Sequence, residues 1–121
     1  MPPIEEVLLR LKFIRSKRQE YLISLSLDSG GNIIRRRTVT IGLLDMAVAH
    51  PREVFAGPLK DRAAAIIVAH NHPSGNPNPS NEDIKTTQQL VSAGQLLGIP
   101  VRDHIIIASK GYYSFMRNYL I

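Results

Sequence analysis

Residues 63–83 read AAAIIVAHNHPSGNPNPSNED and contain the clearest signals for the fold. The apolar run at 63–69 has the length and the β-branched content of a central strand that is covered on both faces. A turn rich in proline, glycine and asparagine follows, and Ser80 with Asp83 three residues later has the pattern of a capping box. These features predict a buried strand, a loop and then a helix that runs to about Leu97.

Two histidines lie at the end of this predicted strand. Residues i and i+2 of a strand point to the same face, so His70 and His72 can approach one ion while Asn71 points away. Asp83, in the first turn of the predicted helix, can bring its carboxylate back toward the strand end. Two imidazoles and a carboxylate are ligands that zinc uses when a fourth position stays open for water. We therefore expect a hydrolytic zinc site, whose bound water has a pKa of about 7.

The remaining elements complete an α/β pattern. Helical spacing of apolar residues predicts a short amphipathic helix at about 3–12. Apolar runs and a Gly-Gly-Asn turn predict a hairpin of strands at 20–27 and 33–41. Further predicted elements are a helix from Pro51 to about 57–58 or one turn later, a strand at 101–108 and a short strand at 112–115. Hairpins combined with a strand–helix–strand crossover predict a mixed sheet flanked by helices.

Length and composition restrict the protein classes. With 121 residues and 44% hydrophobic content, the chain is expected to form a single domain over 1–121. It has no cysteine, which excludes disulfides, thiolate zinc sites and the zinc deaminases that need P-C-x-x-C. It also lacks the H-E-x-x-H motif of helical zinc proteases. No segment approaches the roughly 18 apolar residues of a membrane span, and no signal-peptide pattern opens the chain. We expect a cytoplasmic protein that makes no contact with membranes.

Positive charge is concentrated in the first third of the chain. The formal net charge is +5, and residues 1–40 hold eight Lys or Arg against four acids. A basic face can attract the phosphates of nucleic acid, but charge on an exposed strand also prevents unwanted pairing with other strands. Arg35 and Arg37 should share one strand face and Arg36 the other, so the three do not form one patch. Nucleic-acid contact therefore remains one alternative and a solvated strand edge the other.

The motifs at the predicted site resemble a known family. His70-x-His72, seven residues and then Ser80-x-x-Asp83 is similar to the JAMM signature of JAB/MPN metalloprotease domains. The words HNHPSG at 70–75, PRE at 51–53 and DHIII at 103–107 resemble the C-terminal domain of the RadC family, traditionally labelled DNA repair proteins. The resemblance spans about residues 18–116. It implies a cytidine-deaminase-like three-layer α/β sandwich with one catalytic zinc ion on the two histidines and Asp83, and a peptide or isopeptide substrate.

The same resemblance implies roles for two further residues. A glutamate on an early strand acts as general base in JAMM domains, and Glu20 at the start of the first predicted strand corresponds to it best. Glu53 is the rival, although its Pro-Arg-Glu context favours pairing with Arg52 or the backbone. Ser80 would stabilise the oxyanion in addition to capping the helix. His104 is expected to lie around the site or in the core, because three protein ligands are enough for catalytic zinc.

Three hypotheses about function follow. The first is a zinc-dependent peptidase or isopeptidase with Glu20 as base. The second is a DNA-associated module of the repair family, in which the zinc site serves phosphodiester cleavage or structure only. The third is an interaction domain that retains the site without using it. RadC-like proteins commonly have a helical region of helix-hairpin-helix character ahead of this domain, for which residues 1–17 leave no room.

Overall fold

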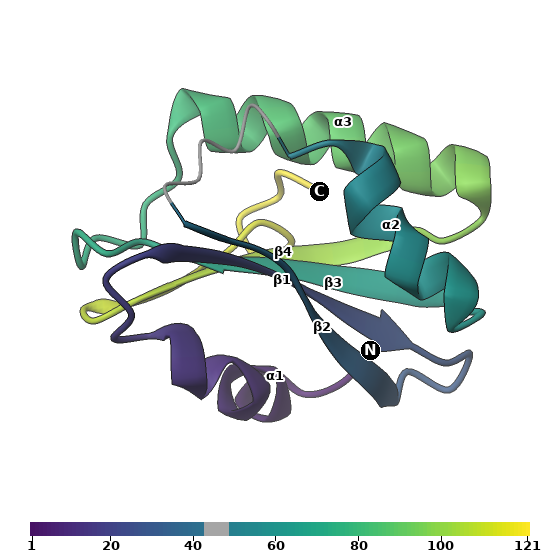
Figure 1. The fold of residues 1–121 in the computed structure, drawn as a ribbon, viewed down its shortest axis with the longest axis horizontal. Coiled ribbons are helices and arrows are strands. Elements are labelled where there is room, and N and C mark those ends of the chain that lie inside the picture. The colour runs from purple at the N-terminus through teal and green to yellow at the C-terminus, as the bar shows by residue number, and fades with distance from the viewer. Residues whose placement is uncertain (43–48) are drawn as a thin grey trace.

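The computed structural model describes residues 1–42 and 49–121, which form a mixed β-sheet between helices (Figure 1). The elements in chain order are α1 (Ile4–Leu11), the 3-10 turn η1 (Lys12–Ile14), β1 (Glu20–Leu27), β2 (Ile33–Gly42), α2 (Pro51–Lys60), β3 (Ala65–Asn71), α3 (Asn81–Leu97), β4 (Val101–Ala108) and β5 (Gly111–Ser114). This architecture confirms the predicted α/β fold. None of the helices in the described parts of the chain is long and apolar enough to cross a membrane.

The five strands are arranged in the order β2-β1-β3-β4-β5. Only β3 and β4 are parallel, whereas the other three neighbouring pairs are antiparallel. The parallel pair is joined by α3, as a strand–helix–strand crossover requires. The strand β3 therefore lies in the middle of the sheet, and all seven of its residues are buried, as its continuous apolar run predicts.

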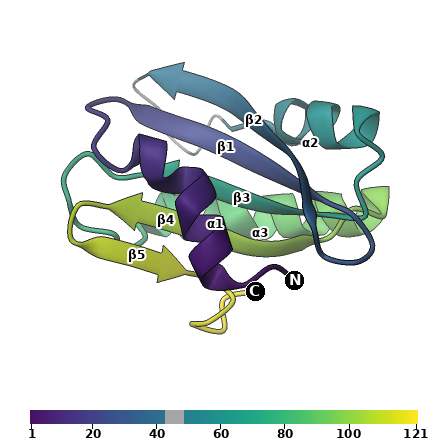
Figure 2. The ribbon, with the colours of Figure 1, turned by 90° about the horizontal axis from the view of Figure 1, so that it is seen from below.

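Helices cover both faces of the sheet and divide the core into two layers. One layer lies under α1 and includes alternate β3 residues such as Ile67 and Ala69 (Figure 2). The other includes Ile66 and Val68 together with Phe55 of α2, and it lies under α2 and α3. Because side chains alternate along a strand, His70 belongs to the face that α3 covers and Asn71 to the face that α1 covers.

Helix α3 begins and ends as the sequence predicts. The Ser80 side chain accepts a hydrogen bond from the Asp83 backbone and the Asp83 carboxylate accepts one from the Ser80 backbone, which completes the capping box. At the other end Gly98 adopts a left-handed conformation with φ of 74°. Helix α2 extends through Pro58 to Lys60, which is the later of its two predicted ends.

Some boundaries differ from the predictions by one or two residues. The strand β3 starts at Ala65 and continues to Asn71, because its pairing with β1 and β4 extends past the apolar run. The first helix is one residue shorter at each end than predicted and continues as η1. The strand β5 covers Gly111–Ser114, so Phe115 follows it and turns into the core, where it is fully buried.

Candidate metal centre

His70 and His72 lie at the carboxyl end of β3, facing the start of α3. Their Nε2 atoms are 3.0 Å apart. The Asp83 carboxylate approaches both, with Oδ2 3.2 Å from His72 Nε2 and Oδ1 3.5 Å from His70 Nε2. Each of the three residues offers one ligand atom, and these atoms all lie within 4.8 Å of one another. The structure thus brings together the three side chains that the sequence predicts as zinc ligands.

The hydrogen bond on the far side of His72 fixes which nitrogen has a lone pair. His72 Nδ1 lies 2.9 Å from the carbonyl oxygen of Asn76. A carbonyl can only accept, so Nδ1 donates its proton, and the neutral form of His72 therefore has its lone pair on Nε2, the atom that faces Asp83. The Asn76 carbonyl belongs to the loop between β3 and α3, and this loop therefore orients the His72 ring toward Asp83.

A buried chain of hydrogen bonds orients the ring of His70 and determines which of its nitrogens has a lone pair. The Thr87 hydroxyl donates to the Asp83 backbone carbonyl at 2.7 Å, so it accepts from His104 Nδ1 at 2.5 Å. The His104 Nε2 atom is then an acceptor, and it lies 2.7 Å from His70 Nδ1, which donates to it. His70 Nε2 is left with a lone pair that points at the Nε2 of His72. Hydrogen bonds of this kind, made by the ring nitrogen that does not bind metal, orient histidine ligands in metalloproteins.

The three ligand atoms fit a zinc ion. Ligands of a tetrahedral zinc ion at about 2.0–2.2 Å are separated from one another by roughly 3.3–3.5 Å. The two Nε2 atoms are 3.0 Å apart, and each lies within 3.5 Å of one of the two Asp83 oxygens, so small shifts would bring one oxygen and both nitrogens to these separations. Two nitrogen lone pairs 3.0 Å apart repel each other unless a proton or a cation lies between them. Nitrogen and carboxylate donors suit zinc, and the three leave a fourth coordination position.

The pKa directions agree with a site that holds positive charge. Burial alone would raise the pKa of Asp83, but the hydrogen bonds that its carboxylate accepts from His70 and His72 when these rings are protonated at Nε2 outweigh burial and hold the pKa well below its usual range. Burial lowers the pKa of His70. The hydrogen bond to Asp83 raises the pKa of His72. Asp83 is therefore ionised at neutral pH, and its charge is available to a cation.

Ser80 and Glu20 lie close to these ligands. Ser80 Oγ accepts from the Asp83 backbone N–H at 3.0 Å, while Asp83 Oδ2 accepts from the Ser80 N–H at 2.9 Å. Glu20 opens β1 and is half-buried, two residues before Leu22, which pairs with His70. Its carboxylate lies close enough to His72 to contribute to the raised pKa of that histidine, after the larger effect of Asp83.

Comparison with known proteins identifies the family of this chain. The sequence model of the RadC-like JAB domain matches residues 4–120. This chain belongs to the RadC-like JAB domain family. A UPF0758 protein of Methanospirillum hungatei is 50% identical over 105 residues, which cover 87% of this chain and 46% of that protein. A UPF0758 protein of Pelobacter propionicus is 50% identical over 103 residues, covering 85% and 45%. The chain thus spans about half the length of these relatives.

In this RadC-like JAB domain Glu53 has the surroundings expected for a structural residue. It lies in the first turn of α2 and is exposed. The Arg52 Nε atom lies 3.5 Å from its Oε1 atom. This pairing is the one that its Pro-Arg-Glu context predicts.

His104 is fully buried and contacts the candidate ligand His70 without belonging to the three-residue group. Phe115 stacks on its other side, with ring centroids 4.6 Å apart, so this aromatic residue serves the core rather than an exposed stacking surface. Thr87, which completes the hydrogen-bond chain, was not singled out from the sequence. Its position four residues after Asp83, one helical turn along α3, is the signal that could have identified it.

The arginines of β2 divide between the two faces as predicted. Arg37 forms a two-pronged ion pair with Asp61, and Arg35 approaches the same carboxylate at 3.9 Å. Arg36 lies on the other face, where its guanidinium stacks over Phe13 at 4.3 Å. All three arginines therefore have a partner within the domain, and the contact of Arg35 is the longest of the ion pairs.

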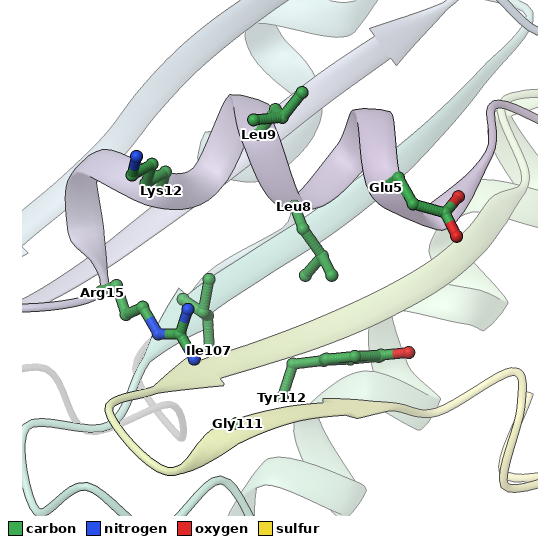
Figure 3. A pocket seen from close by; sticks show the side chains of 8 residues that line it. All are labelled: Glu5, Leu8, Leu9, Lys12, Arg15, Ile107, Gly111 and Tyr112. Carbon is green, nitrogen blue, oxygen red and sulfur yellow. The ribbon is translucent and has the colours of Figure 1, made fainter.

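A groove of about 480 Å³ lies beside α1 on the opposite face of the sheet from the two histidines (Figure 3). Arg15 closes one end, where its Nε atom donates to the Ala108 carbonyl at 3.1 Å. The groove is lined by Glu5, Leu8, Leu9, Lys12, Arg15, Ile107, Gly111 and Tyr112. It shares no lining residue with the candidate metal centre.

Proposed function

We propose that this domain is a zinc-dependent hydrolase of the JAMM type that cleaves a peptide or isopeptide bond. The observation that supports this most strongly is the convergence of the two Nε2 lone pairs and the Asp83 carboxylate at spacings that suit tetrahedral zinc. A zinc ion held there would lower the pKa of a water in the open position to about 7 and would polarise the scissile carbonyl.

Glu20 is the general base in this proposal. It would accept a proton from the attacking water and deliver that proton to the leaving amine. Its place beside the end of β3 and its electrostatic effect on His72 support the assignment. Glu53 is the weaker candidate, because it is exposed and paired with Arg52.

Ser80 would stabilise the negative charge that develops on the substrate oxygen. Its hydroxyl oxygen accepts the capping bond from Asp83, and accepting a bond leaves the hydroxyl proton for another acceptor. A donor fixed at a helix start next to the metal ligands suits an oxyanion, because it needs no reorganisation during the reaction.

The test combines metal analysis with activity on peptide, ubiquitin-like and DNA substrates. Glu20→Gln is expected to retain one zinc per chain and to lose turnover by at least about 100-fold. His70→Ala is expected to lose both zinc and turnover. Glu53→Gln is the matched control, because it neutralises an exposed glutamate, and it should behave as the unmodified protein. Full turnover in the Glu20 variant together with a loss in the Glu53 variant would transfer the role of base to Glu53.

A second candidate function is DNA association, which the excess of Lys and Arg over residues 1–40 favours. Binding through phosphates releases counterions, so affinity for DNA should fall steeply as salt rises. Arg35→Ala is the most direct variant, because Arg35 is exposed and makes the longest contact with Asp61. A flat salt dependence, or no binding at low salt, would leave this charge as a solvated strand edge.

A further inference from the structure

Asn71, the residue between the two histidine ligands, is completely buried and points to the face opposite to theirs. Among the described residues, its side-chain amide hydrogen-bonds to the backbone at the start of β1 and just before it. Oδ1 accepts from the Tyr21 N–H at 2.7 Å, and Nδ2 donates to the carbonyls of Gln19 at 3.0 Å and Lys17 at 3.4 Å. Both ends of the amide are therefore used.

These bonds hold the segment that contains Glu20. Glu20 and Tyr21 pair with β2 on one side. On the other side, the described pairing between β1 and β3 starts only at Leu22, opposite His70. The Asn71 amide takes the place of that pairing before Leu22, and it binds the residues immediately before and after Glu20. Two fixed flanking backbone groups leave the Cα of Glu20 little freedom.

Because side chains alternate along a strand, the position of Tyr21 also determines which face Glu20 points to. Tyr21 packs against the core layer under α1, on the face where Asn71 lies. Glu20 must then face the other way, toward the histidines, and its effect on the pKa of His72 agrees. The same strand end thus presents two metal ligands on one face and, on the other, the amide that holds the glutamate backbone.

We propose that Asn71 is a positioning residue that holds Glu20 at the metal centre, an inference that rests on the proposed role of Glu20 as base. Asn71 contacts neither the ligand atoms nor the substrate in this proposal. It acts through the backbone at Gln19 and Tyr21. An amide suits the task because one side chain both donates and accepts.

The experiment compares the unmodified chain with Asn71→Ala and Asn71→Asp, each loaded with zinc or with cobalt(II). Zinc affinity is measured by chelator competition, amide hydrogen exchange is followed at Tyr21, and cobalt-induced shifts in the NMR spectrum report the position of the Glu20 amide relative to the metal. Asn118→Ala is the matched control, because its amide also binds a backbone carbonyl, that of Ser114 at 2.8 Å, away from the site.

In Asn71→Ala we expect zinc affinity within about threefold of the unmodified chain, because all three ligands remain. Exchange at Tyr21 should accelerate by about tenfold while helix α3 keeps its protection. The cobalt-induced shift of the Glu20 amide should change, and the Asn118 control should show neither effect. Hydrolysis should fall in Asn71→Ala but show no further fall when Glu20→Gln is already present.

Asn71→Asp covers the case in which the alanine variant does not fold, because it preserves size and the acceptor for Tyr21. Its second oxygen would repel the carbonyls of Gln19 and Lys17, so the Glu20 shift should still change while exchange at Tyr21 stays closer to normal. An unchanged Glu20 shift in both variants, or a loss of zinc as severe as in His70→Ala, would overturn the proposal. If the unmodified chain binds neither metal, the proposed function fails, whereas unaltered exchange at Tyr21 in Asn71→Ala refutes the Asn71 contact alone.

Discussion

Replacing Thr87 by valine is expected to weaken zinc binding, although no Thr87 atom belongs to the ligand set. Valine has the same shape but removes the acceptor for His104 Nδ1–H. The metal-free protein can escape this loss by moving the His104 proton to Nε2 and the His70 proton to its own Nε2, where it can approach the Asp83 carboxylate. The zinc-bound protein cannot, because His70 Nε2 must keep its lone pair for the metal.

The size of the loss in zinc affinity follows from the burial of the hydrogen-bond chain from Thr87 through His104 to His70. His104 is fully buried, and a buried donor without an acceptor costs about 1–3 kcal/mol. At about 1.4 kcal/mol per factor of ten, zinc should bind about 5- to 150-fold more weakly. Changes around histidine ligands typically weaken metal binding by about 10- to 100-fold, which is the same range.

The assay is competition for zinc with a chromogenic chelator at fixed pH, accompanied by thermal unfolding of each variant. Thr87→Ser is the matched control, because it preserves the hydroxyl and removes one buried methyl group. We expect its zinc affinity to stay within about threefold of normal, while its stability falls by about 1 kcal/mol. A folded Thr87→Val variant that binds zinc as tightly as the unmodified chain would refute the hydrogen-bond chain. Equal weakening in both variants would assign the effect to packing.

Three further predictions concern pH and packing. Zinc should be released below about pH 6. The first proton should go to His72, because the hydrogen bond to Asp83 raises the pKa of this histidine. Full retention of zinc after dialysis at about pH 4 would count against histidine ligands. Asp61→Asn should reduce stability by at most about 1 kcal/mol at neutral pH, because solvent screens the pair. The bond to Arg37 lowers the pKa of Asp61 in the folded protein. The stability that Asp61 contributes is therefore complete above its unfolded-state pKa of about 4 and is lost as pH falls through its lower folded-state pKa. Denaturation curves of Asp61→Asn and the unmodified chain should converge in acid. Gly94→Ala should lower the melting temperature despite the better helix propensity of alanine, since the new Cβ would lie 2.5 Å from the Ile99 carbonyl oxygen; an increase would show that the contact relaxes freely.

The features that the sequence predicted well depend on local patterns. The apolar run before His70 predicted a fully buried strand, and Ser80 with Asp83 predicted the helix start, because periodicity and capping act over a few residues. Helix α2 was harder to delimit, because Pro58 lacks a backbone donor. It nevertheless lies inside the helix, where it is buried beside Phe55.

The contacts behind the site could not be predicted in the same way. His104 reaches His70 because β3 and β4 pair with Val68 opposite His104, across a register irregularity near Ile66. No local pattern fixes that register. Asn71 meets the backbone at Tyr21 for a comparable reason, since residues 50 positions apart are brought together only by the pairing of β1 with β3.

The capping box of α3 has a consequence for the exchange of metal ions. Its two bonds join Ser80 and Asp83 alone, so the start of the helix needs no cation to form. Many small zinc domains unfold when a chelator withdraws their metal. If the candidate metal centre binds an ion, we expect that ion to depart and be replaced by another while the scaffold stays folded, so that the metal supply of the cell, rather than refolding, would determine which cation the domain holds.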